Sequence, residues 1–191
     1  MADEAAQLAE AVDLQPLGTL APGTLEALAA RLSRQVRLPV HTRAPASIPL
    51  RRVSGREQLD AGALLEALEA SVPAGRLLVG VTEDDIAVPV FSFVFGLARQ
   101  GGAACVVSLA RTDPAFYGLP ADLELAQGRA VAEVLHELGH LAGLEHCSDK
   151  GCLMSFAGNV ERVDTRGGRF CASCAARLPR WLRSPPAAEA V

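Results

Sequence analysis

The chain of 191 residues has no apolar run that approaches the roughly 20 residues needed for a membrane-spanning helix. Its N-terminal segment, MADEAAQLAEAVDLQP, is acidic and lacks the basic-then-apolar order of a secretion signal. These two absences lead us to expect a cytoplasmic protein that does not bind membranes.

An excess of positive charge is also missing. The chain has 18 Lys and Arg residues against 22 Asp and Glu residues, for a formal net charge of −4, whereas general nucleic-acid binders are usually basic. The C-terminal end is nevertheless locally basic, and its arginines are Arg162, Arg166, Arg169, Arg177, Arg180 and Arg183. We expect no nucleic-acid partner, and strong salt-dependent binding in a filter assay would contradict this expectation.

Half of the residues are hydrophobic and 21% are charged, which suits a folded core and argues against disorder. The length suits one domain with a small appendage. Residues 1–18 show little pattern, and we expect them to be loosely ordered. We expect an N-terminal subdomain over residues 19–146, a C-terminal subdomain over residues 147–183 and a frayed tail over residues 184–191, in a monomeric protein.

Helices and mixed strands alternate in the predicted order of elements. Helical spacing of leucines predicts helices from about Thr24, which could cap the first one, and from about Gln58 to Val72. A longer helix is predicted from about Leu123 to Ala142, and a short one in CASCAARLPRWLR. The predicted strands are VRLPVHTR, RLLVGVTEDD, VFSFVFGLA and AACVVSLAR. This arrangement is of the α/β type.

The segment HELGHLAGLEHC, residues 136–147, holds three histidines and a cysteine. His136 and His140 are four residues apart, so a helix places both imidazoles on one face. Glu137 lies one step round the helix and flanks the point at which the imidazoles aim. This H-E-x-x-H pattern is typical of two zinc ligands and a carboxylate that polarises a bound water. The short pattern alone also occurs by chance in helices.

His146 lies six residues after His140. On a continuing helix it would be about 9 Å further along the axis and could not reach the same ion. The chain must therefore turn back, and Gly143 is where a helix-ending, left-handed residue is expected. We predict that His136, His140 and His146 bind one catalytic zinc with a fourth position open for water, and that Glu137 is the general base.

Four of the five cysteines fall between positions 147 and 174. The pairs Cys147-x4-Cys152 and Cys171-x2-Cys174 have the spacing of a closed, tetrahedral zinc site. A disulfide pair, which a reducing compartment disfavours, and buried free thiols are the alternatives. We predict a structural zinc here, and hence two zinc ions per chain, with adjacent His146 and Cys147 bound to different ions. Cys105 lies in an apolar strand and is expected in the core.

The segment HELGHLAGLEHCSDKGCLM followed by CASC resembles the archaemetzincins (archaelysins), a family of the metzincin clan. The family pattern is H-E-x-x-H-x-x-G-x-x-H-C-x4-C-x-M, a spacer and C-x-x-C, and the spacer here, residues 155–170, is one residue shorter. The stretches FSFVFGLA, VVSLAR and FYGLP extend the resemblance over about residues 35–180.

The resemblance implies a metzincin fold with a twisted mixed sheet, an active-site helix and a C-terminal part built around the second zinc. It implies that the strand near Phe91–Leu97 is the antiparallel edge strand beside the cleft, to which an extended peptide substrate adds. Phe95 is therefore a candidate substrate-binding residue. Met154 would lie in a methionine turn beneath the metal and support it by packing, although a lone methionine is often only a core filler.

Some metzincins carry a tyrosine two residues after the turn methionine that reaches the zinc. That position is Phe156 here, and the only tyrosine is Tyr117. Tyr117 is a candidate substrate-binding residue that could stabilise the oxyanion from its loop, with packing on the protein surface as the equal alternative.

The sequence therefore predicts a zinc metallopeptidase that hydrolyses peptide bonds, in which Glu137 takes a proton from the activated water and passes it to the leaving amine. The alternative is a zinc-stabilised binding or regulatory protein with weak or no peptidase activity, against which the presence of Glu137 argues. Endopeptidases and aminopeptidases share this zinc core, so both specificities stay open.

Overall fold

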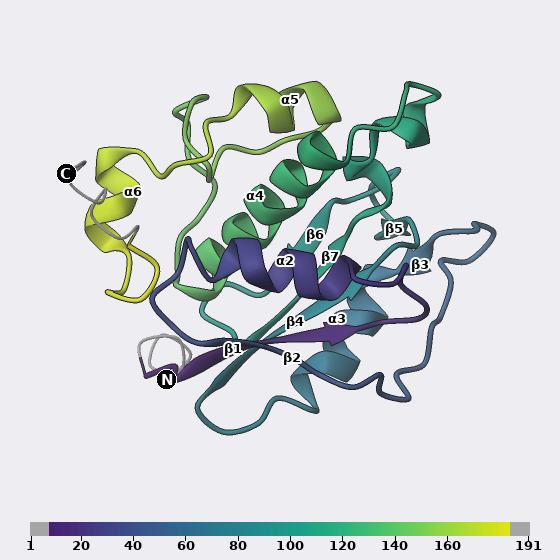
Figure 1. The fold of residues 1–191 in the computed structure, drawn as a ribbon, viewed down its shortest axis with the longest axis horizontal. Coiled ribbons are helices and arrows are strands. Elements are labelled where there is room, and N and C mark those ends of the chain that lie inside the picture. The colour runs from purple at the N-terminus through teal and green to yellow at the C-terminus, as the bar shows by residue number, and fades with distance from the viewer. Residues whose placement is uncertain (1–7, 184–191) are drawn as a thin grey trace.

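A computed structural model describes residues 8–183 as an α/β fold with helices on both sides of a twisted sheet (Figure 1). Residues 1–7 and the predicted tail, 184–191, lie outside the described residues. The strands are β1 (Ala11–Pro16), β2 (Val40–Thr42), β3 (Leu59–Asp60), β4 (Arg76–Thr82), β5 (Ile86–Ala87), β6 (Gly96–Ala98) and β7 (Ala104–Ser108). The helices are α2 (Thr24–Leu32), α3 (Ala61–Glu69), α4 (Leu123–Leu141), α5 (Val160–Thr165) and α6 (Ala172–Arg177), with 3₁₀ helices η1 (Ala110–Thr112) and η2 (Pro114–Tyr117).

The main sheet has the strand order β2-β1-β4-β7-β6. Strand β1 pairs in parallel with β2 and β4, and β4 pairs in parallel with β7. The edge strand β6 runs antiparallel to β7, with Leu97 opposite Val106. The predicted fold class, a mixed sheet with an antiparallel edge strand, is therefore confirmed.

Strand β4 shows why the predicted apolar runs become central strands. Leu77 and Val79 pack into the core beneath α2 and α4, while Leu78 packs into the core beneath α3. A strand that is buried on both faces needs apolar residues throughout, because neither face meets water. In Figure 1, α2 and α4 lie in front of the sheet and α3 lies behind it.

The N-terminal prediction was wrong for the residues of β1. Residues 11–16 form a fully buried strand between β2 and β4 instead of a loosely ordered segment. Asp13 interrupts the apolar pattern of AVDLQP, which conceals the strand in the sequence. The buried Asp13 carboxylate forms ion pairs with Arg76 and, at 3.2 Å, with Arg43, which compensate its charge.

The predicted edge strand is shorter than expected. Strand β6 begins only at Gly96, and the preceding phenylalanine-rich segment, residues 91–95, is irregular. Within it, the Val94 amide donates to the carbonyl of Ile86 at 3.0 Å. The alternating phenylalanines therefore line a cleft instead of one face of a strand.

The structure also differs from the sequence-based expectation at two helices, α2 and α5. Thr24 is the first residue of α2 and does not cap it; Gly23 precedes the helix with φ of 80°, and the Thr24 hydroxyl donates to Glu83 at 3.2 Å. Helix α5, which the sequence did not predict, begins after Asn159, whose side chain accepts from the Arg162 amide at 3.0 Å. This helix has only six residues, which is too short for helical periodicity to be visible in the sequence.

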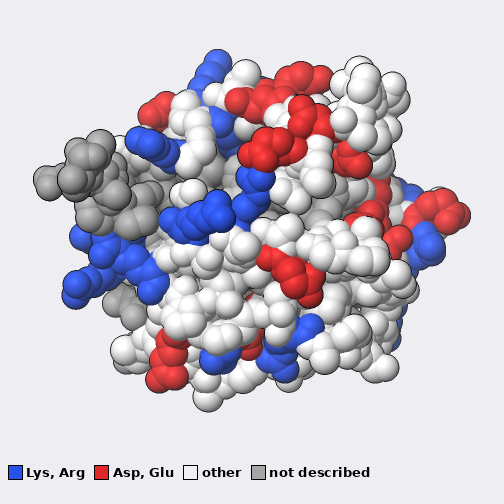
Figure 2. Space-filling view, viewed as in Figure 1, with Lys and Arg blue, Asp and Glu red and all other residues white. Residues whose placement is uncertain are grey.

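The charge of the molecule is unevenly spread. Figure 2 shows Lys and Arg side chains gathered toward the side where α6 lies, with Asp and Glu more abundant toward the opposite side. None of the helices within residues 8–183 is both long and apolar enough to cross a lipid bilayer.

Candidate metal centre and cleft

Helix α4 presents the first two histidines and then ends as the glycine predicts. Asp122 caps its start by accepting from the Leu125 amide at 3.0 Å. At its end, Gly143 has φ of 88°, and its amide donates to the carbonyl of His140 at 2.9 Å. Glycine adopts this left-handed conformation without steric cost. The chain therefore doubles back and carries His146 toward the helix face.

The three histidines converge on one point. The nearest ring nitrogens of His136, His140 and His146 all lie within 4.8 Å of one another. The ring centroid of His140 lies 4.7 Å from that of His136 and 4.9 Å from that of His146, and the centroids of His136 and His146 are 5.4 Å apart. His136 is buried, His140 is half-buried and His146 is exposed, so the centre opens toward solvent beside His146.

Backbone carbonyls fix which nitrogens face the centre. Nδ1 of His136 lies 2.8 Å from the carbonyl oxygen of Leu153, and Nδ1 of His140 lies 2.8 Å from that of Leu144. A carbonyl can only accept, so each Nδ1 carries the proton and each Nε2 keeps a free lone pair.

The spacing of these lone pairs fits a metal ion. The Nε2 atoms of His136 and His140 are 3.1 Å apart, and two lone pairs at this distance repel unless a cation lies between them. Two nitrogens bound to one tetrahedral zinc at about 2.0–2.1 Å are roughly 3.3 Å apart. The arrangement therefore suits zinc without rearrangement of the helix.

The protonation of the imidazoles also suits metal binding. Burial lowers the pKa of His136 well below its usual range, and the nearby Arg166 guanidinium acts in the same direction. Burial likewise lowers the pKa of His140 and His146. All three rings are neutral at neutral pH, which is the state that binds a metal.

Glu137 lies between α4 and the edge strand. Its side chain is buried and lies so close to Gly96 of β6 that a Cβ there would be 2.5 Å from Oε1. Burial raises the pKa of Glu137 well above its usual range, the Glu133 carboxylate acts in the same direction, and Arg166 opposes both. A divalent cation beside the carboxylate would lower that pKa. Glu137 is therefore placed where a carboxylate can exchange a proton with a group in the cleft.

Met154 lies directly beneath α4. A Cβ on Gly139 would overlap the sulfur of Met154, so the glycine inside the HELGH motif makes room for the methionine. Met154 is fully buried and packs against the helix that carries the histidines. This packing fits the supporting role expected for Met154, which stays a prediction.

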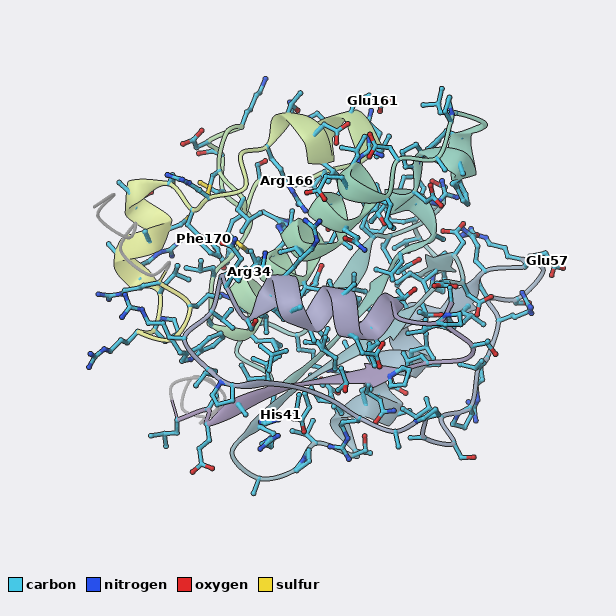
Figure 3. The ribbon with its side chains drawn as sticks, viewed as in Figure 1. Arg34, His41, Glu57, Glu161, Arg166 and Phe170 are labelled. Atoms are coloured by element: carbon cyan, nitrogen blue, oxygen red, sulfur yellow. The ribbon has the colours of Figure 1, made fainter. Side chains whose placement is uncertain are left out.

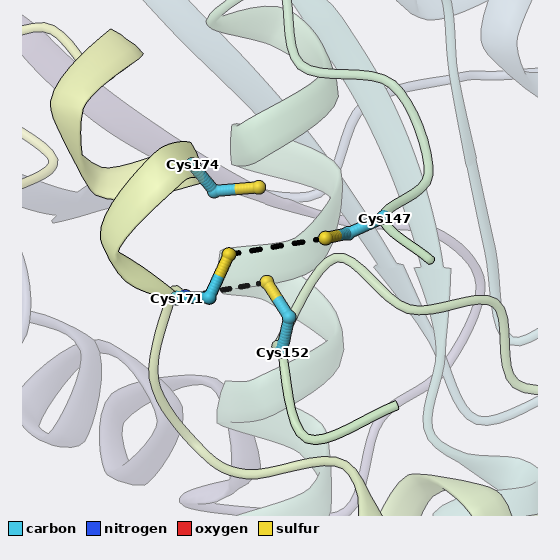
Figure 4. A group of neighbouring side chains, drawn as sticks. All are labelled: Cys147, Cys152, Cys171 and Cys174. Atoms are coloured by element: carbon cyan, nitrogen blue, oxygen red, sulfur yellow. Dashed lines mark hydrogen bonds between the residues drawn. The ribbon is translucent and has the colours of Figure 1, made fainter. Parts of the chain in front are cut away.

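The four clustered cysteines form a second candidate metal site (Figure 4). Their sulfur atoms all lie within 4.8 Å of one another, and Cys147 Sγ is 3.8 Å from Cys171 Sγ. Two sulfurs bound to one tetrahedral zinc at about 2.3 Å are roughly 3.8 Å apart. The sulfur of Cys152 accepts from the amides of Met154 and Cys171 at 3.4 and 3.3 Å. Burial raises the pKa of the Cys152 thiol, and these two donors partly oppose that effect.

None of the five cysteines, all within the described residues, forms a disulfide. Cys105 is fully buried in β7, and burial raises the pKa of its thiol well above the usual range. Its predicted place in the core is therefore confirmed.

The two candidate sites share one stretch of backbone. His146 and Cys147 are adjacent, yet they belong to the separate histidine and cysteine groups. The Cys147 amide donates to the carbonyl of Met154 at 2.9 Å. This hydrogen bond ties the segment that carries His146 to the methionine beneath α4.

A cleft of about 460 Å³ opens over the histidines and Glu137. Residues 91–98 form one wall, and residues 156–158 contribute to the other. Phe95 lines this cleft but is largely buried, because it packs against Val160 and Val163 of α5. The ring of Phe156 is 55% exposed and lies edge-on to His146, with centroids 5.3 Å apart.

Tyr117 does not reach this cleft. It is not among the described residues that line the cleft, and its hydroxyl donates to the carbonyl of Arg111 at 3.1 Å. Its partial exposure and this local hydrogen bond favour the surface-packing alternative.

A second cavity, of about 510 Å³, is larger than the cleft but contains none of the histidines. It lies between α2, α4 and the segments that follow β4 and β7, and Glu83, Asp84 and Asp113 are among its walls. The chemistry therefore concentrates in the smaller cleft.

Gln100, Glu133 and Arg166 also line the cleft, although the sequence did not single them out as site residues. Gln100 donates to the carbonyl of Gly143 at 2.7 Å and holds the end of α4. Glu133 could have been found, because it lies three residues before His136 and four before Glu137, on the same helix face. Arg166 gives no such signal, since only the fold brings it to α4.

Comparison with known proteins agrees with this geometry. The model of peptidase family M54 matches residues 67–180. The chain is 34% identical to the archaemetzincin of Archaeoglobus fulgidus over 166 residues, which cover 86% of this chain and 96% of that protein. It is 43% identical to the archaemetzincin of Methanocaldococcus jannaschii over 102 residues, 53% of this chain and 57% of that protein. The matched segment thus spans little more than half of this second relative.

Solved structures extend the similarity to the fold. The malonate complex of the Archaeoglobus fulgidus archaemetzincin superposes with a TM-score of 0.75 at 33% identity and covers 87% of this chain and 99% of that one. A zinc-dependent peptidase from Methanocorpusculum labreanum superposes with a TM-score of 0.78 at 29% identity and covers 87% of this chain and 98% of that one.

Proposed function

Because this chain belongs to peptidase family M54, we propose that it is a zinc metallopeptidase that hydrolyses peptide bonds in the cleft over the histidines. The observation that carries the proposal is the convergence of three neutral imidazoles within 4.8 Å beside the buried carboxylate of Glu137. Three histidines leave one position of a tetrahedral zinc open, as catalytic sites require.

His136, His140 and His146 would hold the catalytic zinc. A zinc ion bound there supplies a Lewis acid that activates water and polarises a carbonyl. Glu137 accepts the proton of the attacking water and transfers it to the leaving amine, which its position against Gly96 allows because the carboxylate faces the cleft. Leu153 and Leu144 hold the imidazoles in the tautomer that presents Nε2.

The peptide substrate would bind along β6. This strand ends the sheet order and, among residues 8–183, pairs as a strand only with β7, so its other side can hydrogen-bond to an extended chain. Strand β6 also borders Glu137 through Gly96. Main-chain pairing there would bring a scissile bond to the histidines with little dependence on side chains, while Phe95 forms part of the wall.

Cys147, Cys152, Cys171 and Cys174 would hold the second, structural zinc. Four thiolates make a closed site with no open position for water. We assign residues 147–183 to a small C-terminal unit organised by this ion, and residues 11–146, which include β1 of the main sheet, to the part that ends with the third histidine. The protein would thus carry two zinc ions per chain.

A peptide-library cleavage assay on the wild type and on Glu137→Ala, with zinc content measured in parallel, tests this proposal. We expect the variant to keep its zinc and to lose roughly 10²–10⁴-fold in cleavage rate, because the proton acceptor is gone. Retained turnover in Glu137→Ala would contradict the role of this residue. A zinc-loaded wild type that cleaves no peptide would favour the alternative, a zinc-stabilised binding protein.

A further inference from the structure

A buried ion pair lies directly behind the histidine centre. Arg166 Nη2 donates to Glu133 Oε1 at 2.5 Å, and both side chains are almost completely buried. Glu133 is on α4, whereas Arg166 follows α5 and lies between that helix and α4 (Figure 3). The pair therefore joins two segments that are far apart in the sequence.

Arg166 also contacts the segment beneath the metal centre. Its Nη1 lies 3.1 Å from Nδ1 of His136 and 3.4 Å from the carbonyl oxygen of Ser155. Because Nδ1 of His136 already donates to Leu153 at 2.8 Å, the guanidinium is a close neighbour of the ring and not its hydrogen-bond donor. A single side chain thus touches α4, a ligand ring and the methionine turn, which we define as residues 153–156.

The backbone around Arg166 is itself anchored to the methionine turn and to the cysteine site. The Gly167 amide donates to the carbonyl of Gly151 at 2.9 Å, and the Leu153 amide donates to the carbonyl of Arg169 at 2.9 Å. A Cβ on Gly167 would be 2.7 Å from the Gly151 oxygen. The position of Arg166 is therefore set by the strand-like pairing that precedes Cys171.

The buried pair of Arg166 and Glu133 is not explained by a gain in folding stability. Both charges are removed from water, and Nε of Arg166 is buried with no hydrogen-bond partner among residues 8–183. Buried ion pairs can often be replaced by apolar side chains without loss of stability. A function at the neighbouring centre explains why such a pair lies here.

We propose that Arg166 and Glu133 are positioning residues for the histidine centre, an inference that rests on the proposed zinc site. The pair ties the methionine turn to α4 and so sets the direction in which His136 presents Nε2. Neither residue is among the three histidines that converge on the centre, and both side chains are almost completely buried, so the pair acts through His136. Groups behind metal ligands commonly act in this way, and their loss typically lowers metal affinity 10–100-fold.

The test measures metal affinity of the full chain rather than cleavage. Arg166→Met, Glu133→Gln and the double variant are titrated with Co²⁺ and with Zn²⁺ against a chelator, and the metal-free proteins are melted. Thiolate-to-cobalt bands report the cysteine site, while bands without thiolate character report the histidine site. We expect each single variant to lose roughly 10–100-fold in affinity at the histidine site only and to melt at a lower temperature.

The double variant separates positioning from structural support. Once both charges are gone, we expect the metal-free protein to regain most of the lost melting temperature, while the affinity of the histidine site stays reduced. A double variant that binds metal as tightly as the wild type would overturn the inference, because the pair would then serve stability alone. The inference would also be overturned if the single variants bound metal at the histidine site as tightly as the wild type does. A wild type that holds no metal at the histidines would overturn it as well.

Arg76→Met provides a matched control, since Arg76 pairs with buried Asp13 and neither residue lines the cleft over the histidines. We expect it to lower the melting temperature without any change in metal affinity. Failure of the proposed peptidase function is distinguishable from failure of this inference. A wild type that binds zinc but cleaves nothing contradicts the former, whereas only the affinities decide the latter.

Discussion

The carboxylate of Glu137 lies against the backbone of Gly96, so that a Cβ on Gly96 would be 2.5 Å from Oε1 and 2.8 Å from Cδ. The edge strand and the proposed proton acceptor thus occupy adjoining positions in the cleft. Any side chain at position 96 must move the carboxylate.

Gly96→Ala tests this relationship. We expect roughly a 10²-fold loss of peptide cleavage, because a displacement of about 1 Å in a catalytic group has an effect of that size, with zinc content unchanged. Gly168→Ala is the matched control, since a Cβ there meets nothing within 4 Å. Equal cleavage by the Gly96 variant and the control would show that Glu137 acts from a different position.

Gly139 and Gly128 make a second matched pair on α4. An alanine at Gly139 would overlap the sulfur of Met154, whereas a Cβ at Gly128 meets nothing within 4 Å. We expect Gly139→Ala to lower the free energy of unfolding by roughly 1–3 kcal/mol through overpacking. Gly128→Ala should raise it by about 0.5–1 kcal/mol, because alanine favours the helix. Denaturant unfolding of the metal-free proteins measures both, and a stabilising Gly139→Ala would contradict the packing seen here.

Chelator should remove the two metals in a definite order. Three neutral imidazoles, of which His146 is exposed, should hold zinc less firmly than four thiolates, whose charges neutralise the ion. We expect cleavage to disappear while half of the zinc remains bound. Zinc content and activity are followed through the same titration, and earlier loss from the thiolate site would reverse this ordering.

Replacement of Cys147 by serine should act first on the neighbouring histidine. The cysteine group anchors the segment that carries His146, so we expect roughly a 10–100-fold loss of metal affinity at the histidine site. The helix content of α4, followed by circular dichroism, should not change. Cys105→Ala is the control, because Cys105 is buried in β7 and belongs to neither metal group. It should lower stability and leave metal affinity intact.

The strand that the sequence concealed can be tested with two leucines. Leu14 of β1 is fully buried, whereas Leu8 is 70% exposed. We expect Leu14→Ala to lower the free energy of unfolding by about 2–5 kcal/mol and Leu8→Ala to change it by no more than about 0.5 kcal/mol. Urea unfolding compares the two, and similar small effects would mean that β1 is not part of the core.

Local patterns in the sequence determined the histidine centre and the cysteine group. The spacing of His136 and His140 on one helix face, and the left-handed conformation of Gly143, follow from helix geometry and steric freedom alone. The same holds for β4, because a run of apolar residues has few places other than the centre of a sheet. Such features depend on neighbours in the chain, so they can be read without the fold.

Only the tertiary structure decided which distant residues support the centre. Arg166 reaches Glu133 because the backbone near Gly167 pairs with the backbone near Gly151, and Asp13 can lie inside the sheet because Arg76 and Arg43 neutralise it there. A charged side chain in a sequence predicts exposure on average, and its burial depends on a partner that the fold must bring to it. The candidate ligands of the centre can thus be identified from short-range spacing in the sequence, whereas their positioning depends on long-range contacts.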